Sequence, residues 1–543
     1  MKLPLASRRI DDEYTYCWAR EHMSTVINNK IYIIGGFIQE TKRIAHSDPR
    51  QSRMNTRTIN NPDLLVLDLT KSGRLQGSLP YMATRYPLPQ FVPIVKWGSF
   101  ISPNSSTLVL SHGEPVPYTT VSSTNHSERE ADHSFESGGV YEFHIPSNSW
   151  RQFGLVVVNN VINTYSITRG ASVWASAGER GILLGGRFHP GISHTRTTYE
   201  YYKALNMDFG MWSETEGDAI GKNLEFPALV SVPYVGEKGI LVATGGTLGD
   251  DPGAALDLQE VDVHDVAAGK WYKQATSSAS SIFPDPRHHH CMVSVRYGGT
   301  TSVIVMGGTP RTYSESNKTA MNDIWLLSLP SFKWVELGTF PGGIGRESMT
   351  CESVGLGRYV LVLGGEKGGS NFSQPCDEDE GVMLFDLETL EWTKEYKVGR
   401  WKMNGKIEKL VGDASVPKGG WQDAGMGELF FQTTNTENKT TGSDGNKPGD
   451  DPRTQFDNTD VGKDDSNGLG TGAKVGIGLG VAAAVILFLI FEYWWLRKRK
   501  PTSKFRNPDV VHELPAGVPQ MATVSKCSGD VQEFYGAGAV SNK

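Results

Sequence analysis

The segment DPRHHHC, residues 285–291, contains the side chains of this chain best suited to chemistry. Imidazole and thiolate groups are ligands for copper or zinc, and His288, His289, His290 and Cys291 supply both kinds. In an extended segment successive side chains point to opposite faces, so that only His288 and His290 could share one ligand sphere. Histidines outside a convergent cluster are usually structural, and we expect a structural or surface role for these.

Other sequence patterns typical of catalysis are missing. The chain has no phosphate-binding glycine loop, no H-E-x-x-H and no G-x-S-x-G. The acidic residues Asp250, Asp251 and Asp257 lack the spacing of an EF-hand, and the acidic run at 377–380 is most simply a solvated surface. We therefore predict no catalytic residues, no metal site and no cofactor.

A short apolar run that ends in two glycines recurs along the chain, followed each time by a strand-like hairpin with a tryptophan. A double glycine allows the backbone to turn sharply at the end of a buried strand. Counted from the second glycine, the tryptophan follows after 26, 25, 26 and 27 residues. The four clear copies are Gly185 and Gly186 with Trp212, Gly245 and Gly246 with Trp271, Gly307 and Gly308 with Trp334, and Gly364 and Gly365 with Trp392.

Two weaker copies precede these four. Gly35 and Gly36 stand before a hairpin without tryptophan, and the segment 111–113, Ser-His-Gly, stands before a hairpin that ends at Trp150. The five tryptophans lie 62, 59, 63 and 58 residues apart, which gives six repeats of similar length. Each repeat offers four antiparallel strands, the composition of one propeller blade. We predict an all-β propeller of six blades, with seven left open.

At these residues the sequence resembles the kelch-repeat family, whose signature pairs a double glycine with a downstream aromatic residue. The resemblance covers about residues 15–395. It implies a β-propeller but not an activity, because propellers host many unrelated functions. Some kelch propellers, similar to galactose oxidase, are copper radical oxidases with two histidines, two tyrosines and a cysteine bonded to one tyrosine. Those ligands cannot be matched to positions of this chain.

Composition agrees with a turn-rich β protein and argues against a nucleic-acid partner. The 543 residues include 61 glycines, and the formal net charge is −7. The repeats contain no basic cluster, so we expect no nucleic acid as a partner.

The region after the repeats predicts a membrane anchor. Residues 475–496, VGIGLGVAAAVILFLIFEYWWL, are long and apolar enough for a transmembrane helix, and the basic run RKRK follows. Residues 433–474 are almost free of apolar side chains and predict a flexible polar stalk, whereas 497–543 predict a disordered cytoplasmic tail. The intervening segment 398–431 keeps apolar residues, so we expect it to pack on the propeller or to supply strands that help close the ring. The predicted propeller domain is therefore 15–432.

The side of the membrane is harder to assign. Residues 1–14 contain no recognisable signal peptide, so either a signal lies upstream or the propeller faces the cytosol, and we favour the first. Four cysteines precede the predicted helix, Cys17, Cys291, Cys351 and Cys376, and allow two disulfides with three connectivities. Five N-x-S/T triplets are candidate N-glycosylation sites: Asn104, Asn125, Asn317, Asn371 and Asn438.

These features together predict a single-pass membrane protein, similar to kelch-repeat membrane proteins of filamentous fungi, with an extracellular or lumenal propeller. Its function would be non-catalytic binding of a protein or glycan by the loops between strands. The inserts at 38–62 and 112–138 supply much of the length of these loops. Two alternatives stay open: a membrane-anchored copper radical oxidase and a cytosol-facing adaptor. Bound copper would favour the first, and cytosolic protein partners without glycans the second.

Overall fold

The structure is a computed structural model. It describes residues 15–44, 53–75, 82–116, 139–155, 157–158, 161–162, 166–175, 180–189, 198–203, 210–215, 224–249, 254–297, 300–311, 319–367, 381–412 and 416–431. The chain divides into two compact units, Met1–Asp457 and Asn458–Lys543, and all described residues belong to the first.

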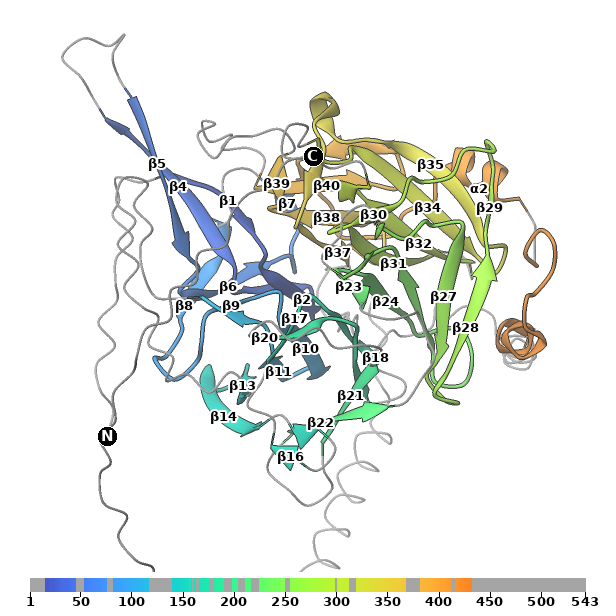
Figure 1. Cartoon of the computed structure of the whole chain (residues 1–543). Helices are drawn as coiled ribbons and strands as arrows, with labels where there is room; N and C mark the ends of the chain where they lie inside the picture. The colour runs from blue at the N-terminus through green and yellow to red at the C-terminus, as the bar shows by residue number, and fades with distance from the viewer. Residues whose placement is uncertain are drawn as a thin grey trace, which may run out of the picture. The chain divides into compact units, whose positions relative to one another are not determined.

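In the described part of the chain the strands form six antiparallel blades in sequence order, which Figure 1 shows arranged around a centre from blue to orange. Each blade has four strands that follow one another from the innermost to the outermost. Blades 1 to 3 are β2 (Met23–Ile27), β3 (Lys30–Ile34), β6 (Asp63–Asp68) and β8 (Thr84–Pro87); β10 (Ser99–Asn104), β11 (Thr107–Ser111), β13 (Gly139–His144) and β14 (Ser149–Leu155); and β18 (Ala171–Ala175), β19 (Arg180–Leu184), β21 (Thr198–Lys203) and β22 (Gly210–Thr215). Blades 4 to 6 are β24 (Ala228–Val232), β25 (Ile240–Thr244), β27 (Glu260–Asp265) and β28 (Lys270–Ala275); β31 (Cys291–Tyr297), β32 (Thr300–Met306), β34 (Asp323–Leu329) and β35 (Lys333–Thr339); and β37 (Thr350–Val354), β38 (Tyr359–Leu363), β40 (Val382–Asp386) and β41 (Glu391–Thr393).

A small ribbon accompanies every blade at the end where its first strand begins and its second strand stops. The residues before the first strand pair with the residues after the second, because these two segments lie side by side in an antiparallel blade. The ribbons are β1 (Thr15–Arg20), β4 (Phe37–Ile44) and β5 (Arg53–Asn60); β9 (Val95–Lys96) and β12 (Glu114–Pro115); β17 (Ser166–Thr168) and β20 (Arg187–His189); β23 (Leu224–Glu225) and β26 (Thr247–Leu248); β30 (Arg287–His288) and β33 (Thr309–Pro310); and β36 (Arg346–Glu347) and β39 (Glu366–Lys367). Five short strands lie elsewhere: β7 (Gly73–Arg74), β15 (Val157–Val158), β16 (Val161–Ile162), β29 (Ser277–Ser278) and β42 (Glu395–Tyr396). Of these, β29 runs parallel to β35.

The ring closes between blade 6 and blade 1, which answers the question of six or seven blades. The innermost strands contact one another in the order β2, β10, β18, β24, β31, β37 and back to β2. His22 Nε2 lies 2.9 Å from Thr350 Oγ1, and Ser24 Oγ donates to Glu352 Oε1 at 2.7 Å. At the outer edge β42 (Glu395–Tyr396) pairs with β7. Closure therefore uses contacts between complete blades and no exchanged strand.

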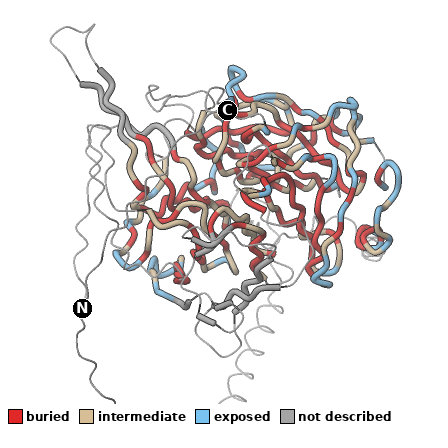
Figure 2. Tube along the Cα trace, viewed as in Figure 1, coloured by how far each residue is buried: buried red, intermediate tan, exposed pale blue. Residues whose placement is uncertain are grey.

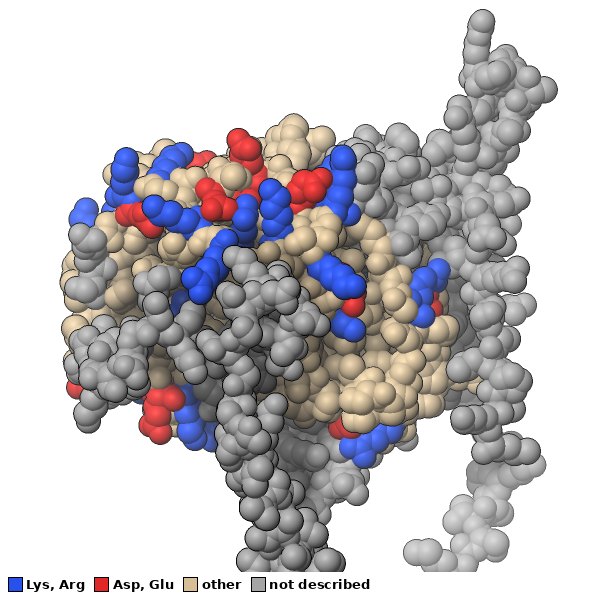
Figure 3. All heavy atoms as spheres, turned by 180° about the vertical axis from the view of Figure 1, so that it is seen from behind, with Lys and Arg blue, Asp and Glu red and all other residues tan. Residues whose placement is uncertain are grey.

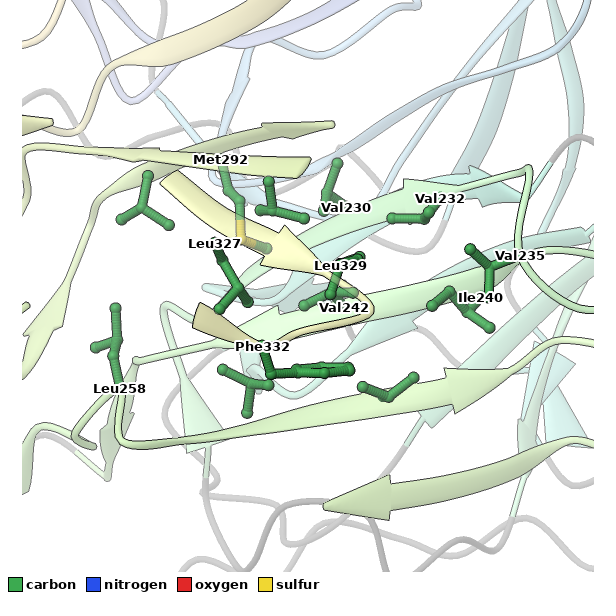
Figure 4. Packing of buried hydrophobic residues seen from close by; sticks show 14 of the residues in the cluster. Val230, Val232, Val235, Ile240, Val242, Leu258, Met292, Leu327, Leu329 and Phe332 are labelled. Atoms are coloured by element: carbon green, nitrogen blue, oxygen red, sulfur yellow. The ribbon is translucent and has the colours of Figure 1, made fainter. Parts of the chain in front are cut away.

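The core lies between neighbouring blades, whose inner strands are mostly buried (Figure 2). Between blades 4 and 5, Val230 and Val242 lie beside Met292, Leu327 and Leu329 (Figure 4). Similar buried clusters join blades 5 and 6, 6 and 1, and 1 and 2. Blades 1, 5 and 6 thus bury apolar side chains against both neighbours, and this burial favours closure of the ring.

The double glycine at Gly307 and Gly308 joins blade 5 to blade 6 through the backbone. Gly307 has φ +57, and a Cβ there would overlap the carbonyl oxygen of Arg346 in the next blade. Gly308 N donates to that same oxygen at 2.8 Å. Equivalent bonds, each to the next blade around the ring, come from Gly36, Gly186, Gly246 and Gly365. A side chain would prevent this approach, so the motif serves contact between blades.

The tryptophans of the outermost strands pack toward the preceding blade where their side chains are described. Trp334 is fully buried, and its Nε1 donates to the carbonyl oxygen of Leu258 in blade 4 at 2.9 Å. Trp392 Nε1 donates to Thr339 O in blade 5 at 2.8 Å. Trp271 is partly buried: it contacts His264 of its own blade, with ring centroids 4.7 Å apart, and packs on a cluster that includes Leu184 of blade 3. The side chain of Trp212 is not described.

The segment after the last blade packs back on the propeller, as expected from its apolar residues. Helix α2 (Gly405–Val411) places Ile407 in the cluster between blades 5 and 6. Residues 424–431 are helical and place Met426, Leu429 and Phe430 in the cluster between blades 4 and 5.

The membrane-spanning helix is the part of the fold prediction that the structure corrects. No helix within the described ranges is long and apolar enough to cross a membrane, which needs about 20 apolar residues. The helices there are short: α2, the helical stretch at 424–431 and the 3-10 turn η4 (Pro341–Gly343). The fold is therefore corrected to an all-β propeller with short helices, and the single-pass membrane placement is withdrawn. Residues 433–474, 475–496 and 497–543 themselves lie outside the described residues.

Candidate functional site

In the histidine segment at 287–291, His290 and Cys291 make contacts with neighbouring blades and serve packing. Cys291 forms a disulfide with Cys351 of blade 6, with Cα atoms 5.7 Å apart. His290 Nε2 lies 2.9 Å from Thr244 Oγ1 of blade 4. His288 Nδ1 and His289 Nδ1 lie 2.5 Å apart. Among the residues that the structure describes, no group of three or more His, Cys, Asp or Glu side chains could hold a metal ion.

Arg287 has a structural partner that the sequence did not show. Its guanidinium is fully buried and holds both carboxylate oxygens of Asp323 at 2.7 Å, and it also donates to Gly307 O at 3.0 Å. Burial alone would raise the pKa of Asp323, but the hydrogen bonds and charge of Arg287 hold that pKa below its usual value. The ion pair fixes the double-glycine turn in place.

Six residues form what we call the axial ring: Glu21, Trp97, Arg169, Phe226, His289 and Ser348. One stands in each blade, between the short ribbon strand and the innermost strand. All six have left-handed backbone angles, with φ of 57, 50, 65, 52, 53 and 55°. All six are partly exposed. Such angles are rare for non-glycine residues, above all for large aromatic ones.

Backbone hydrogen bonds link five of the six neighbouring pairs of residues in the axial ring. The amide of one ring residue donates to the carbonyl oxygen of the ring residue in the preceding blade. Five such bonds run from Glu21 to Ser348 (3.2 Å), Trp97 to Glu21 (3.3 Å), Arg169 to Trp97 (3.3 Å), Phe226 to Arg169 (2.7 Å) and Ser348 to His289 (3.0 Å). The left-handed angle turns the amide and the carbonyl group of each ring residue toward the neighbouring blades. The backbone geometry of the ring is therefore structural.

The side chains of the ring meet across the propeller axis. Trp97 of blade 2 contacts Phe226 of blade 4 edge-on, with ring centroids 5.4 Å apart, and lies 6.4 Å from His289 of blade 5. Blades 2 and 5 are opposite one another, so these contacts are possible only at the centre. His289 lies 3.7 Å from Phe226, and the Arg169 guanidinium lies 5.4 Å from the Trp97 ring and 5.2 Å from the Phe226 ring.

Charged side chains lie along one side of this aromatic centre. Glu21 lies between two cations, 3.7 Å from Arg20 and 3.8 Å from Lys96. Arg20 also forms an ion pair with Glu366 at 2.7 Å, and Lys96 forms one with Glu114 at 3.0 Å. Burial raises the pKa of the Glu21 carboxyl, and the two cations oppose that rise. Burial, together with the charges of His288 and Arg169, lowers the pKa of His289 well below its usual range.

Two ring atoms have hydrogen-bonding capacity left. Within the described residues, neither Trp97 Nε1 nor Glu21 Oε2 has a hydrogen-bond partner. One is a donor only and the other, when ionised, an acceptor only. Both atoms are buried, and Glu21 Oε2 also lies 3.8 Å from Lys96 Nζ, so the centre of the propeller combines aromatic surface with a buried donor and a buried, ion-paired acceptor.

The six blades differ in residue type at the ring positions but not at the positions that pack one blade against the next. Positions that serve packing between blades repeat their residue type, as the double glycines do in five of six blades. The ring positions share one backbone conformation but carry Glu, Trp, Arg, Phe, His and Ser. A position whose backbone is fixed and whose side chain differs in every repeat is free to supply specific recognition.

Most of the predicted site residues fall elsewhere. Asn104 is exposed at the end of β10, where its side-chain oxygen accepts from Ser106 N at 2.9 Å. The other four candidate glycosylation positions, Asn125, Asn317, Asn371 and Asn438, lie outside the described residues, as does Cys376. The ring itself was missed because it has no repeated residue type. In blade 1 the position equivalent to Arg287 is Ala19, since each stands two residues before its ring residue.

The chain shares a long stretch with a fungal protein. It is 33% identical over 172 residues to a kelch repeat-containing protein of Arthroderma benhamiae, a match that covers 31% of this chain and 24% of that protein. That match and the blades described above agree. The chain resembles kelch-repeat proteins in sequence and in the architecture of its blades.

Two further likenesses accompany this kelch relative. The chain is 24% identical over 247 residues to acyl-CoA-binding domain-containing protein 4 of Arabidopsis thaliana, covering 44% of this chain and 31% of that protein. The solved structure of YjhT matches with a TM-score of 0.42 at 12% identity, covering 70% of this chain and 97% of that one. No family model matches the chain. The chain spans about a quarter to a third of the length of the two sequence relatives.

Proposed function

We propose that this kelch propeller is a non-catalytic binding module that recognises a protein partner at the axial ring. The observation that carries the proposal is the ring itself: six different, partly exposed side chains on one strained, hydrogen-bonded backbone. Non-glycine residues held in left-handed angles concentrate at functional sites, where surrounding structure fixes them. Trp and Arg, both present in the ring, are also the residue types enriched at binding hot spots.

The position of the ring supports recognition of a large partner. The connections between second and third strands leave the blades at the same end as the ring, and the inserts at 38–62 and 112–138 belong to two of these connections. Recognition residues commonly lie on such loops of a rigid scaffold. Figure 3, the back view, shows acidic and basic side chains next to one another along its upper part. Interspersed charges of this kind fit a protein partner better than a nucleic acid.

A glycan is a second candidate, favoured by one observation. Trp97 Nε1 and Glu21 Oε2, which have no hydrogen-bond partner among the described residues, lie next to aromatic rings. Both atoms are buried, so a sugar hydroxyl group can accept from the first and donate to the second only when the ring side chains move on binding. A glycan array probed with the full chain tests this candidate separately.

The test compares partners recovered from cells with the full wild-type chain and with Trp97→Ala, Arg169→Ala and Lys273→Ala. Lys273 is exposed on β28, the outermost strand of blade 4, and serves as the control. We expect specific partners to be retained by wild type and Lys273→Ala and to fall at least about tenfold with either ring variant, as for a binding hot spot. Equal recovery by all four proteins would contradict the proposal, provided that thermal unfolding shows each variant folded.

A further inference from the structure

The segment that follows the last blade carries a row of exposed cations on its outer side. Its apolar side chains face the propeller: Tyr396 and Met403 are buried, and Ile407 of α2 lies in the cluster between blades 5 and 6. The charged side chains that alternate with them are exposed. Five of these are Lys or Arg, and we call them the basic row: Lys397, Arg400, Lys402, Lys406 and Lys409.

Hydrogen bonds attach this segment to the propeller at separate points. Val398 N donates to Ser72 Oγ, in the connection between β6 and β8 of blade 1, at 2.8 Å. Trp401 Nε1 donates to Leu356 O, between the first two strands of blade 6, at 3.0 Å. Together with the packing of α2, these contacts fix the path of the segment. The basic row therefore has a defined place on the surface of the propeller.

The cations of the basic row have no ion-pair partner among the described residues. Exposed lysines elsewhere are paired, as Lys270 is with Asp423 at 3.2 Å and Lys273 with Glu260 at 2.9 Å. Residues 394–411 contain six Lys or Arg and two Asp or Glu, a formal net charge of +4, whereas the whole chain carries −7. A surface that is only solvated usually mixes both signs of charge. Packing of the segment explains its inward side chains but not this excess of one sign.

The charges of the segment indicate what kind of partner fits. The excess of cations attracts an anionic partner. Carboxylates interrupt the surface, however: Glu408 lies within the row, and Glu391 and Glu395 are exposed just before it. Nucleic acids and anionic membranes present closely spaced negative charges, which these carboxylates would repel. A peptide can place its carboxylates opposite the cations and uncharged residues opposite Glu408.

The geometry points to the basic row as a docking surface for an acidic segment of another protein. Because the row is held in place before binding, the partner finds its cations already arranged, which reduces the entropy lost on association. The basic row shares no residue with the axial ring, and neither proposal depends on the other.

Fluorescence anisotropy with the full chain tests the proposal, using a labelled twelve-residue peptide of alternating Glu and Ser as the probe. We expect saturable binding that weakens as salt is added, and at least about tenfold weaker binding of the matched Lys and Ser peptide.

Two double variants with the same change in net charge locate the site. Lys402→Glu combined with Lys406→Glu should weaken the acidic peptide at least about tenfold, because it reverses two unpaired cations of the row. Glutamate at position 406 suits the first turn of α2. Lys270→Glu combined with Lys273→Glu on β28 should leave the affinity within about twofold, since those lysines are already paired. Near-ultraviolet circular dichroism checks that each variant is folded.

Carbodiimide crosslinking of the same peptide maps the contact, because it joins peptide carboxylates to lysine amines as amides. We expect adducts at Lys402, Lys406 and Lys409 and none above background at Lys270 and Lys273. Phosphatidylcholine vesicles with about one-third phosphatidylserine should displace the labelled peptide less well, per accessible charge, than unlabelled peptide does. Absence of binding, equal affinity for acidic and basic peptides, equal loss in both double variants, adducts spread evenly over exposed lysines, or stronger displacement by vesicles would each overturn the inference.

Discussion

At the scale of single residues, the two strained motifs of the repeat serve different purposes. The double glycines let neighbouring blades approach, as Gly307 does against Arg346 O, and their type repeats because no other residue fits. The ring residues, such as Trp97 and Phe226, accept the cost of a left-handed angle, about 1–2 kcal/mol each, with a full side chain. Hydrogen bonds between blades account for the left-handed backbone, and the side chains, which differ in every blade, are free to serve recognition.

Substitution of Gly307 tests how much the double-glycine turn contributes to the stability of the propeller. Gly307→Ala should lower the free energy of unfolding by about 2–5 kcal/mol, because a left-handed alanine costs about 1–2 and the overlap with Arg346 O adds about 1–3. Gly269→Ala is the matched control, since Gly269 has φ +66 but nothing within 4 Å of the added Cβ. Urea titration of both variants should show the larger loss for Gly307→Ala; equal losses would contradict the packing role.

Buried histidines predict a loss of stability in acid. Burial lowers the pKa of His22, His264 and His288 to about 4, and that of His112 to about 3. The unfolded chain takes up these protons near pH 6.5 and the folded chain does not, so the free energy of unfolding should fall as pH decreases from about 6.5 to 4. Asp262 opposes this weakly, because burial raises its pKa to about 6.

The pH dependence can be assigned to single sites. His22→Gln should flatten the profile of unfolding free energy against pH by up to about 3 kcal/mol between pH 6.5 and 4, and His144→Gln, at an exposed position, should leave the profile unchanged. Chemical denaturation at several pH values makes the comparison. A His22→Gln profile identical to that of wild type would show that this buried imidazole does not supply the acid sensitivity.

At the scale of elements, the sequence predicted what repeats and missed what does not. The spacing from double glycine to tryptophan located the strands of the later blades, because packing between blades demands the same residue types each time. Residues 38–62 were expected to form a loop, but most of them form the strands β4 and β5. These two strands pair mainly with each other, so no repeated residue pattern marked them in the sequence. The axial ring has no residue-type signal at all; it is visible only once φ and the contacts across the axis are known.

The segment after blade 6 is an element whose contribution can be measured. Phe430 is 6% exposed and stacks on Trp421 with centroids 5.1 Å apart, whereas its neighbour Phe431 is 50% exposed. Phe430→Ala should cost about 3–5 kcal/mol of unfolding free energy and Phe431→Ala less than about 1. Differential scanning calorimetry of the two variants tests this, and a small effect of Phe430→Ala would show that the segment does not stabilise blades 4 and 5.

At the scale of the whole molecule, closure of the ring could not be predicted. The number of blades depends on which first and last strands meet, as with His22 and Thr350, and spacing along the chain does not encode that contact. The membrane-spanning helix was predicted from an apolar run of sufficient length, and that prediction was wrong: the helices within the described part of the chain are too short to cross a membrane. Closure of the ring creates the propeller axis. At this axis, side chains of the opposite blades 2 and 5 come into contact.

The most direct test of the central claim is photo-crosslinking from the axis. A benzophenone amino acid at position 348 of the full chain fits the ring, because the equivalent positions of other blades already hold Trp97 and Phe226. A second protein carries the same group at position 273 on β28. We predict partner adducts from position 348 and none of the same mass from position 273. Adducts from position 273 alone would contradict binding at the axial ring.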